Sequence, residues 1–205
     1  MALEDSIQQV LAELEETPIG EATVRDLLTH RSGLPGWRPI YERLEARGMT
    51  PGCSGGTQSI RAAVLSLIRD EPLIYVRGER SVYSDLGFML LGFLVERLSG
   101  MALDRWCEEA IARPTGADPL LFHPVAGHRQ SLPEVSRIAP TEQDVWRHRL
   151  LRGEVHDENA ASMGGVAGHA GLFGTAESVL AVSGAWLRGY HGRESILEER
   201  LVRQF

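Results

Sequence analysis

The stretch from Val82 to Gly100, VYSDLGFMLLGFLVERLSG, most limits what this chain can fold into. Its apolar side chains leave almost no polar face, so a helix here must be covered by protein on nearly every side. The run is too short to cross a bilayer and carries charged residues near its end, so we predict a buried core helix. Ser84 or Asp85 is expected to cap its first turn, and Gly100 stands where a left-handed helix stop is expected.

Apolar residues at helical spacing predict further helices around this one. Thr23, three residues before Asp26, has the spacing of a capping box, and Thr175 is a second expected N-cap. Proline marks the expected ends of several helices. The expected helices cover roughly residues 3–17, 24–28, 57–71, 101–113, 176–187 and 196–205, with a short strand or an extended link at 73–76.

Residues 114–175 differ from the rest, because prolines and glycines interrupt every helical or alternating pattern. Loops of this length inside a domain usually carry or cover a functional site. We therefore predict one mainly α-helical domain over 1–205. It comprises a helical part at 1–113, an irregular pocket-rim loop at 114–175 and C-terminal helices at 176–205.

The composition of the chain excludes several kinds of catalytic site and disfavours one class of partner. All 21 residues in the Lys+Arg total are arginine, since the sequence contains no lysine. Schiff-base chemistry, a Walker-type phosphate loop and a Ser-x-x-Lys nucleophile are therefore excluded from this chain. The formal net charge of -7 disfavours nucleic acid as a partner, because phosphate binding needs a basic surface. Cys53 and Cys107 match no metal-binding spacing.

Two other kinds of site are weakly indicated. A metal set can be drawn from residues 156–158 with His169, or from His123 and His128, but neither set has the His-Glu-x-x-His register. The glycines at 165, 168 and 171 are spaced like a phosphate cradle, yet no clear strand precedes them and no lysine follows. We predict neither a metal nor an organic cofactor.

Tyr83, Ser84 and Asp85 stand where the core helix begins. A tyrosine acts as a base or proton shuttle only if a neighbouring cation favours the phenolate, since its free pKa is about 10. From the residues alone, Tyr83 fits either such a role or simple packing, and Ser84 fits a helix cap. His30 and Ser32 form a weaker candidate pair, because polar residues at helix ends usually satisfy backbone groups.

Several blocks, in order, resemble the serine β-lactamase-like hydrolases, which include class C β-lactamases, DD-peptidases and related esterases. Residues 23–35, TVRDLLTHRSGLP, are similar to the family's TVRDLLTHTSGLP, and Tyr83-Ser84-Asp85 resembles its Tyr-x-Asn block. The blocks closest to an esterase-like branch are residues 138–142, 155–159 and 164–173. The resemblance covers nearly the whole chain.

The resemblance implies acyl transfer through a serine in Ser-x-x-Lys, with the lysine and the motif tyrosine exchanging a proton. Tyr83 then corresponds to the shuttling tyrosine, and Asp85 replaces the usual asparagine and positions substrate or the lysine. His169 and Gly171 are expected to line the pocket. The aspartate favours esterase or peptidase relatives over penicillin-like amide chemistry.

In the family, the Ser-x-x-Lys helix precedes the part that resembles this chain, and a Lys/His-Thr-Gly strand follows it. We therefore expect a helical segment of an α+β fold that lacks much of the central antiparallel sheet. The implied substrate is a small ester, amide or peptidoglycan-like compound. The alternatives are a catalytically inactive binding protein and an inactive fragment.

Two expectations concern how such a segment behaves. An exposed, sheet-facing apolar surface is expected to promote self-association. No secretory segment opens the chain, so as given it is expected in the cytoplasm, while the periplasm is open to a longer parent.

Overall fold

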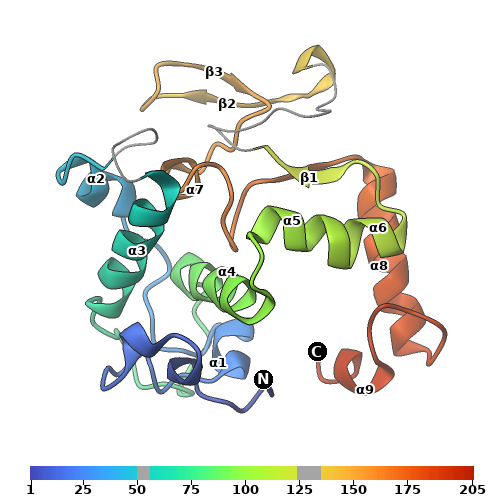
Figure 1. Ribbon diagram of the computed structural model, residues 1–205, viewed down its shortest axis with the longest axis horizontal. Coiled ribbons are helices and arrows are strands. Elements are labelled where there is room, and N and C mark those ends of the chain that lie inside the picture. Colours follow the sequence, from blue (N-terminus) through green and yellow to red (C-terminus); the bar gives the residue numbers. More distant parts are fainter. Residues whose placement is uncertain (50–55, 124–134) are drawn as a thin grey trace.

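Helix α4 (Asp85–Ser99) lies at the centre of the computed structural model, which describes residues 1–49, 56–123 and 135–205 (Figure 1). The Ser84 hydroxyl accepts a hydrogen bond from the Gly87 N–H, and Gly100 closes the helix at φ 69°. Both predicted helix ends are therefore confirmed. The buried positions of α4 form the middle of the hydrophobic core: Leu86, Met89, Leu90, Phe93 and Leu94.

The N-terminal elements surround one side of α4 (Figure 1). Thr23 and Asp26 form the predicted capping box at the start of α1, and the predicted helix before Pro72 is α3. Side chains from these elements complete the core, including Leu27 and Val64. The elements are two 3-10 turns (Ile7–Gln9 and Ala12–Leu14), α1 (Val24–Leu28), α2 (Ile40–Glu45) and α3 (Gly56–Arg69).

The continuous helix expected over residues 3–17 is wrong. Ile7, Leu11 and Leu14 are buried as the periodicity requires, but they lie on two 3-10 turns. The Ile7 N–H donates to Ala22 O at 2.9 Å, and Ser6 forms an isolated bridge with Thr23. Backbone pairing with residues 20–23 therefore replaces part of the i to i−4 ladder of an α-helix.

The second half of the chain begins with a nearly continuous helical rod. It runs through Pro114, where the sequence predicted an end, and stops at Gly116 in the left-handed conformation. A π-helical turn lies just before the proline. Such a turn locally changes the hydrogen-bond pattern of the helix and so accommodates a residue that cannot join the regular pattern. The rod consists of α5 (Leu103–Cys107), the π-helical turn (Glu108–Ala112) and α6 (Arg113–Thr115).

Residues 114–175 are more regular than the loop that the sequence predicted. Strand β1 pairs antiparallel with β4, about fifty residues later, and β2 pairs with β3 in a hairpin drawn at the top of Figure 1. Thr175 caps the next helix as predicted. The elements are β1 (Leu120–Phe122), a 3-10 turn (Val135–Arg137), β2 (Pro140–Asp144), β3 (Arg149–Arg152), α7 (Glu158–Ser162), β4 (Leu172–Gly174), α8 (Ala176–Tyr190) and α9 (Glu199–Val202).

The part of the chain that is described is thus mainly helical with two small sheets. Residues 73–76 form no strand. Cys53, His128 and two of the prolines that interrupt the pattern lie outside the described residues, as does most of the glycine-containing stretch 49–57, whose sequence is typical of a flexible loop.

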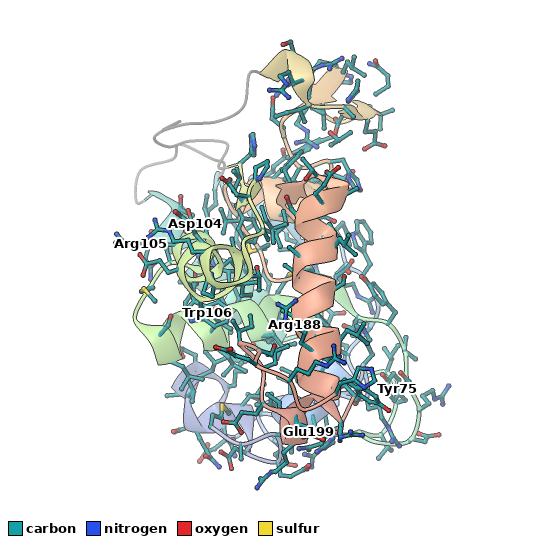
Figure 2. All side chains as sticks on the ribbon, turned by 90° about the vertical axis from the view of Figure 1, so that its right-hand side faces the viewer. Tyr75, Asp104, Arg105, Trp106, Arg188 and Glu199 are labelled. Atoms are coloured by element: carbon teal, nitrogen blue, oxygen red, sulfur yellow. The ribbon has the colours of Figure 1, made fainter. Side chains whose placement is uncertain are left out.

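Helix α8 runs across the front of the molecule in Figure 2, with Arg188 among the labelled side chains on it. Many of its apolar side chains are exposed: Val179, Leu180, Trp186, Leu187 and Tyr190. Within the described ranges, no single helix is long and apolar enough to cross a membrane. Among the described residues, only α4 and the helical rod over 103–115 taken together are long and apolar enough, and these two are bent by 79° relative to each other.

The segment 164–171 crosses α4 at very short range. A Cβ atom at Gly168 would lie 2.0 Å from the Phe88 carbonyl oxygen and 2.9 Å from the Gly92 nitrogen. The Arg61 side chain holds the same segment, because it donates to Val166 O at 2.9 Å while paired with Glu96 on α4. The path of residues 166–169 is thus fixed against the core helix.

Gly168→Ala should destabilise the protein by roughly 2–4 kcal/mol, since the new methyl group overlaps backbone that cannot move without shifting α4. Gly184→Ala is the matched control: its Cβ would meet only the flexible end of Arg188 at 3.4 Å. The control should gain up to about 1 kcal/mol from helix propensity. Chemical denaturation measures both, and equal stability of the two variants would contradict the close contact.

Candidate active site around Tyr83

Tyr83 lies at the surface where the chain enters α4, and its side chain is 68% exposed. Its ring packs on the His30 imidazole with the centroids 4.7 Å apart. The His30 ring also stacks on Phe88 of α4, with the centroids 5.0 Å apart. An exposed phenol is therefore held in place by a ring that is itself fixed to the core helix.

His30 organises the backbone on both sides of Tyr83. Its Nδ1 accepts a hydrogen bond from the Ser84 N–H at 3.0 Å, and its carbonyl oxygen accepts from the Val82 N–H at 2.9 Å. The Tyr75 hydroxyl donates to the same carbonyl at 3.1 Å. His30 adopts φ 57°, a left-handed conformation that is uncommon for a residue other than glycine. Because strained residues persist only where surrounding contacts fix them, this conformation supports a positioning role.

His30 and Ser32, the weaker candidate catalytic pair, bind backbone groups. Ser32 is buried, and its hydroxyl accepts from the Leu34 N–H at 3.3 Å, as in a local turn. These hydrogen bonds of the two side chains therefore serve backbone groups, as is usual for polar residues at helix ends.

Ser84 is a structural residue. Its buried hydroxyl donates to Pro35 O at 2.7 Å and accepts from the Gly87 N–H at 3.3 Å. Both hydrogen-bonding roles of the hydroxyl are occupied, so it is not available as a nucleophile.

Asp85 is the first residue of α4, and its carboxylate lies close enough to the Tyr83 side chain to act on the pKa of the phenol. The charge of Asp85 is the largest of the effects that raise the pKa of Tyr83, followed by burial, the hydrogen bond to Asp85 and the charge of Asp157. Among the described residues, the charges acting on this phenol are carboxylates. Tyr83 is accordingly a protonated donor here, and a role as base needs a cation from elsewhere.

The pKa of Asp85 is itself raised. Burial contributes most and the charge of Asp157 adds to it, while the charges of His169 and His30 and the hydrogen bond from Tyr83 oppose the increase. Asp157 therefore lies close enough to act on both Tyr83 and Asp85.

Asp157 caps α7 and binds His169. Its Oδ1 accepts from the Ala160 N–H at 2.7 Å and lies 2.9 Å from His169 Nε2. Burial alone would raise the pKa of Asp157, but the hydrogen bond and charge of His169, the Ala160 N–H and the charge of His156 outweigh it and lower the pKa. The sequence indicated Asp157 as part of a weak metal set and within the 155–159 block that resembles the family, but it gave no sign that the charge of Asp157 acts on Tyr83.

The two expected pocket-lining residues are both buried. The His169 side chain is 2% exposed, so it reaches the Tyr83 site through Asp157. Gly171 has φ +118°, and a Cβ there would lie 2.3 Å from Gly165 O, so this position shapes the loop. Within residues 1–49, 56–123 and 135–205, no group of three or more histidine, cysteine and acidic residues could hold a metal ion.

A cavity of about 870 Å³ lies elsewhere, between α3, α4 and residues 163–166. Its walls include the Arg61–Glu96 ion pair but none of Tyr83, Asp85 and Asp157. The candidate site is thus an exposed face at the start of α4, separate from this cavity.

The whole chain, residues 1–205, matches the family model described as Beta-lactamase. It is 34% identical over 201 residues to the "Putative D-alanyl-D-alanine carboxypeptidase" of Escherichia coli (strain K12), which covers 93% of this chain and 45% of that protein. The chain thus spans less than half the length of this curated relative.

Solved structures share the fold at lower identity. A penicillin-binding protein from Bacillus halodurans is 20% identical with a TM-score of 0.68, covering 99% of this chain and 56% of that one. EstCE1, "a hydrolase with promiscuous acyltransferase activity", is 21% identical with a TM-score of 0.61, covering 98% and 55%.

The two carboxylates should respond oppositely to amide replacement. Asp85 has a raised pKa, so its ionised form weakens the fold at neutral pH, and Asp85→Asn should raise the free energy of unfolding at pH 7 but not near pH 3. Asp157 has a lowered pKa, so its contribution is present above the unfolded pKa of about 3.9 and is lost as pH falls through the lower folded value.

Asp157→Asn should therefore lower stability by about 1 kcal/mol at pH 7, with the difference shrinking toward pH 3. Asparagine retains the cap and an acceptor for His169, so only the charge changes. Urea denaturation at the two pH values tests both variants, and shifts of the same sign at pH 7 would contradict this electrostatic description.

Proposed function

The chain belongs to the beta-lactamase family, and from this premise we propose that it supplies Tyr83 and Asp85 to the acyl-transfer site of a serine hydrolase. The observation that carries the proposal is that the phenol of Tyr83 is accessible and yet held in a fixed position. Tyr83 is exposed at the start of the core helix, packed on His30 and close enough to the Asp85 carboxylate for that charge to raise the pKa of the phenol. A proton shuttle needs this combination of access and fixed position.

We propose that the acyl nucleophile lies outside these 205 residues. Ser84 is buried and fully hydrogen-bonded, and no lysine is present to complete Ser-x-x-Lys. The family pattern places that motif, the Lys/His-Thr-Gly strand and much of the central sheet in segments that adjoin this one. A lysine from such a segment is the cation that would let Tyr83 act as a base, with Asp85 positioning it or the substrate.

The proposed substrates are small esters, amides or peptidoglycan-like peptides. A relative at 34% identity is named for D-alanyl-D-alanine carboxypeptidase activity, and a structural neighbour is named as a hydrolase with acyltransferase activity. Both names describe reactions at an acyl carbonyl. His169 and Gly171 are proposed to shape the substrate pocket from buried positions beneath its surface.

Tyr83→Phe tests the shuttle in a protein that carries this segment together with the proposed nucleophile. The change keeps the ring that packs on His30 and removes only the hydroxyl, so kcat for a p-nitrophenyl ester should fall by about 10²-fold or more. KM should change much less, because the hydroxyl is needed in the proton-transfer step.

Tyr190→Phe is the matched control, since Tyr190 is an exposed tyrosine on α8 whose ring lies against Arg203. It should leave kcat unchanged. If Tyr83→Phe also left kcat unchanged, the shuttle role would be refuted. Absence of turnover in the unmodified protein would favour a binding protein that retains the family's pocket rim.

We also propose that the chain by itself associates through the exposed apolar residues of α8, with Leu180 as the most exposed of them at 71%. Contiguous apolar surface of this kind favours self-contact. Light scattering over a dilution series should show a mass that falls with concentration. Leu180→Glu should remain monomeric, whereas Gln58→Glu, at an exposed position on α3 and away from the apolar face of α8, should not. A monomer at every concentration would contradict the proposal.

A further inference from the structure

The cavity between α3, α4 and residues 163–166 lies apart from the Tyr83 site and takes no part in the proposed function. Its volume of about 870 Å³ lies within the roughly 300–1,000 Å³ that is usual for small-molecule sites. Leu65, Phe93 and Met163 are among the residues that line it, and all three are buried. The cavity can therefore enclose an apolar group of a small molecule.

Arg61 holds the walls of the cavity together. Its Nη2 donates to Glu96 on α4 at 2.6 Å, and its Nη1 donates to Val166 O at 2.9 Å. The guanidinium carbon also lies 5.2 Å from the centre of the Phe93 ring. Glu96 accepts in addition from the Leu103 N–H, at 3.0 Å, at the start of α5. Because one ion pair joins α3, α4, α5 and residue 166, the cavity is preformed in the folded chain.

The charges that line the cavity do not cancel. Among the described residues of its walls, three are acidic and two are arginines. Arg61 is paired with Glu96, and Arg97 is paired with Glu13. Asp104 is the acidic residue that remains.

Asp104 lies in the first turn of α5, beside Arg105 (Figure 2). Its Oδ1 accepts a hydrogen bond from the Arg105 N–H at 2.8 Å, but the Arg105 guanidinium binds Glu109, also at 2.8 Å. In the part of the chain that the structure describes, no ion pair includes Asp104. The Asp104 carboxylate thus gives the cavity one net negative charge beside an apolar interior.

This negative charge does not indicate a metal site. Over residues 1–49, 56–123 and 135–205, no group of three or more histidine, cysteine and acidic residues could hold a metal ion. A hydrated metal ion would also have to enter an interior lined by Leu65 and Phe93, which is unfavourable for a charged group. An organic cation can use both features, because its charge can lie at Asp104 while its apolar part is buried.

We propose that this cavity is a second ligand site, which binds small organic molecules that carry one positive charge on an apolar body, such as aralkylammonium ions. The positive charge pairs with Asp104, and the body packs on Leu65, Phe93 and Met163. At about 4 Å and an effective dielectric constant of about 20, attraction between unit charges is large enough for a preference of tenfold or more over an uncharged analogue.

Three probes with different end groups test this on the 205-residue chain at pH 7: 3-phenylpropylammonium, 3-phenylpropanol and 3-phenylpropanoate. Binding is followed from the ¹³C-methyl signals of the methionines. Met101 and Met163 line the cavity, whereas Met1 is 48% exposed and serves as the internal reference. The ammonium ion should shift the Met101 and Met163 signals and bind at least about tenfold more tightly than the alcohol. The carboxylate probe should bind more weakly than both.

Asp104→Asn removes the charge at similar size, and it should reduce the preference for the ammonium ion over the alcohol to less than about threefold. Glu177→Gln is the matched control, because it removes an exposed charge on α8 and should leave the preference unchanged. Ala62→Trp changes an exposed position of α3 that lines the cavity, so the new side chain should weaken binding of every probe. Thermal unfolding of each variant confirms that the fold is retained.

The outcomes that would overturn the inference are specific. One is that no probe shifts the Met101 and Met163 signals. The others are equal binding of the ammonium ion and the alcohol, and a preference that survives in Asp104→Asn. None of these results affects the turnover expected for Tyr83→Phe, so failure of this inference is distinguishable from failure of the proposed function.

Discussion

Burial of α4 is the constraint on which the rest of the structure depends. A helix with so little polar surface is stable only when other elements cover it, and here they come from both halves of the chain. The contact between Gly168 and the α4 backbone at Phe88 and Gly92 requires that no side chain intervene. Because His169 follows Gly168 and Asp85 begins α4, the packing that stabilises the core also brings the site residues together.

The arginine-only composition has a structural counterpart. A guanidinium group has five donors in a planar fork, so it can bind a carboxylate and a backbone carbonyl at once, whereas an ammonium group is a compact point charge. Several arginines do this where the chain has no regular pairing. Such bonds join Arg38 to Glu71 and Trp37 O, Arg61 to Glu96 and Val166 O, and Arg147 to Asp144, Val155 O and His156 O. These bonds fix loop segments that lie outside the strands.

The helices with strong local signals could be predicted from the sequence. Ser84, Thr23 and Thr175 are caps in the structure as expected, because capping is decided within one turn. Residues 3–17 were mispredicted because apolar spacing does not distinguish an α-helix from two 3-10 turns that pair with residues 20–23. Strands β1 and β4 are three residues long and pair across fifty residues, so no local pattern shows them.

The residues of the candidate site likewise divide into those that the sequence identifies and those that it does not. Tyr83 and Asp85 are adjacent in sequence and could be identified together, although from local chemistry alone their role stayed open. His30 was visible only as half of a weak pair, because its stacking on Tyr83 and Phe88 is a tertiary contact. Asp157 was indicated only within the weak metal set and the 155–159 block, because its effect on Tyr83 and Asp85 depends on a tertiary arrangement that spans more than seventy positions.

The environments of the three acidic groups also order their proton affinities. Burial and neighbouring charge raise the pKa of Tyr83 and of Asp85, whereas His169 and the α7 N-terminus lower that of Asp157. Groups whose pKa values are pushed apart in one site take different roles in proton transfer. A proton that enters this site is held by the Tyr83–Asp85 pair, while Asp157 remains a fixed charge. The two carboxylates are therefore ordered by their surroundings, so that Asp85 takes up a proton at a higher pH than Asp157 does.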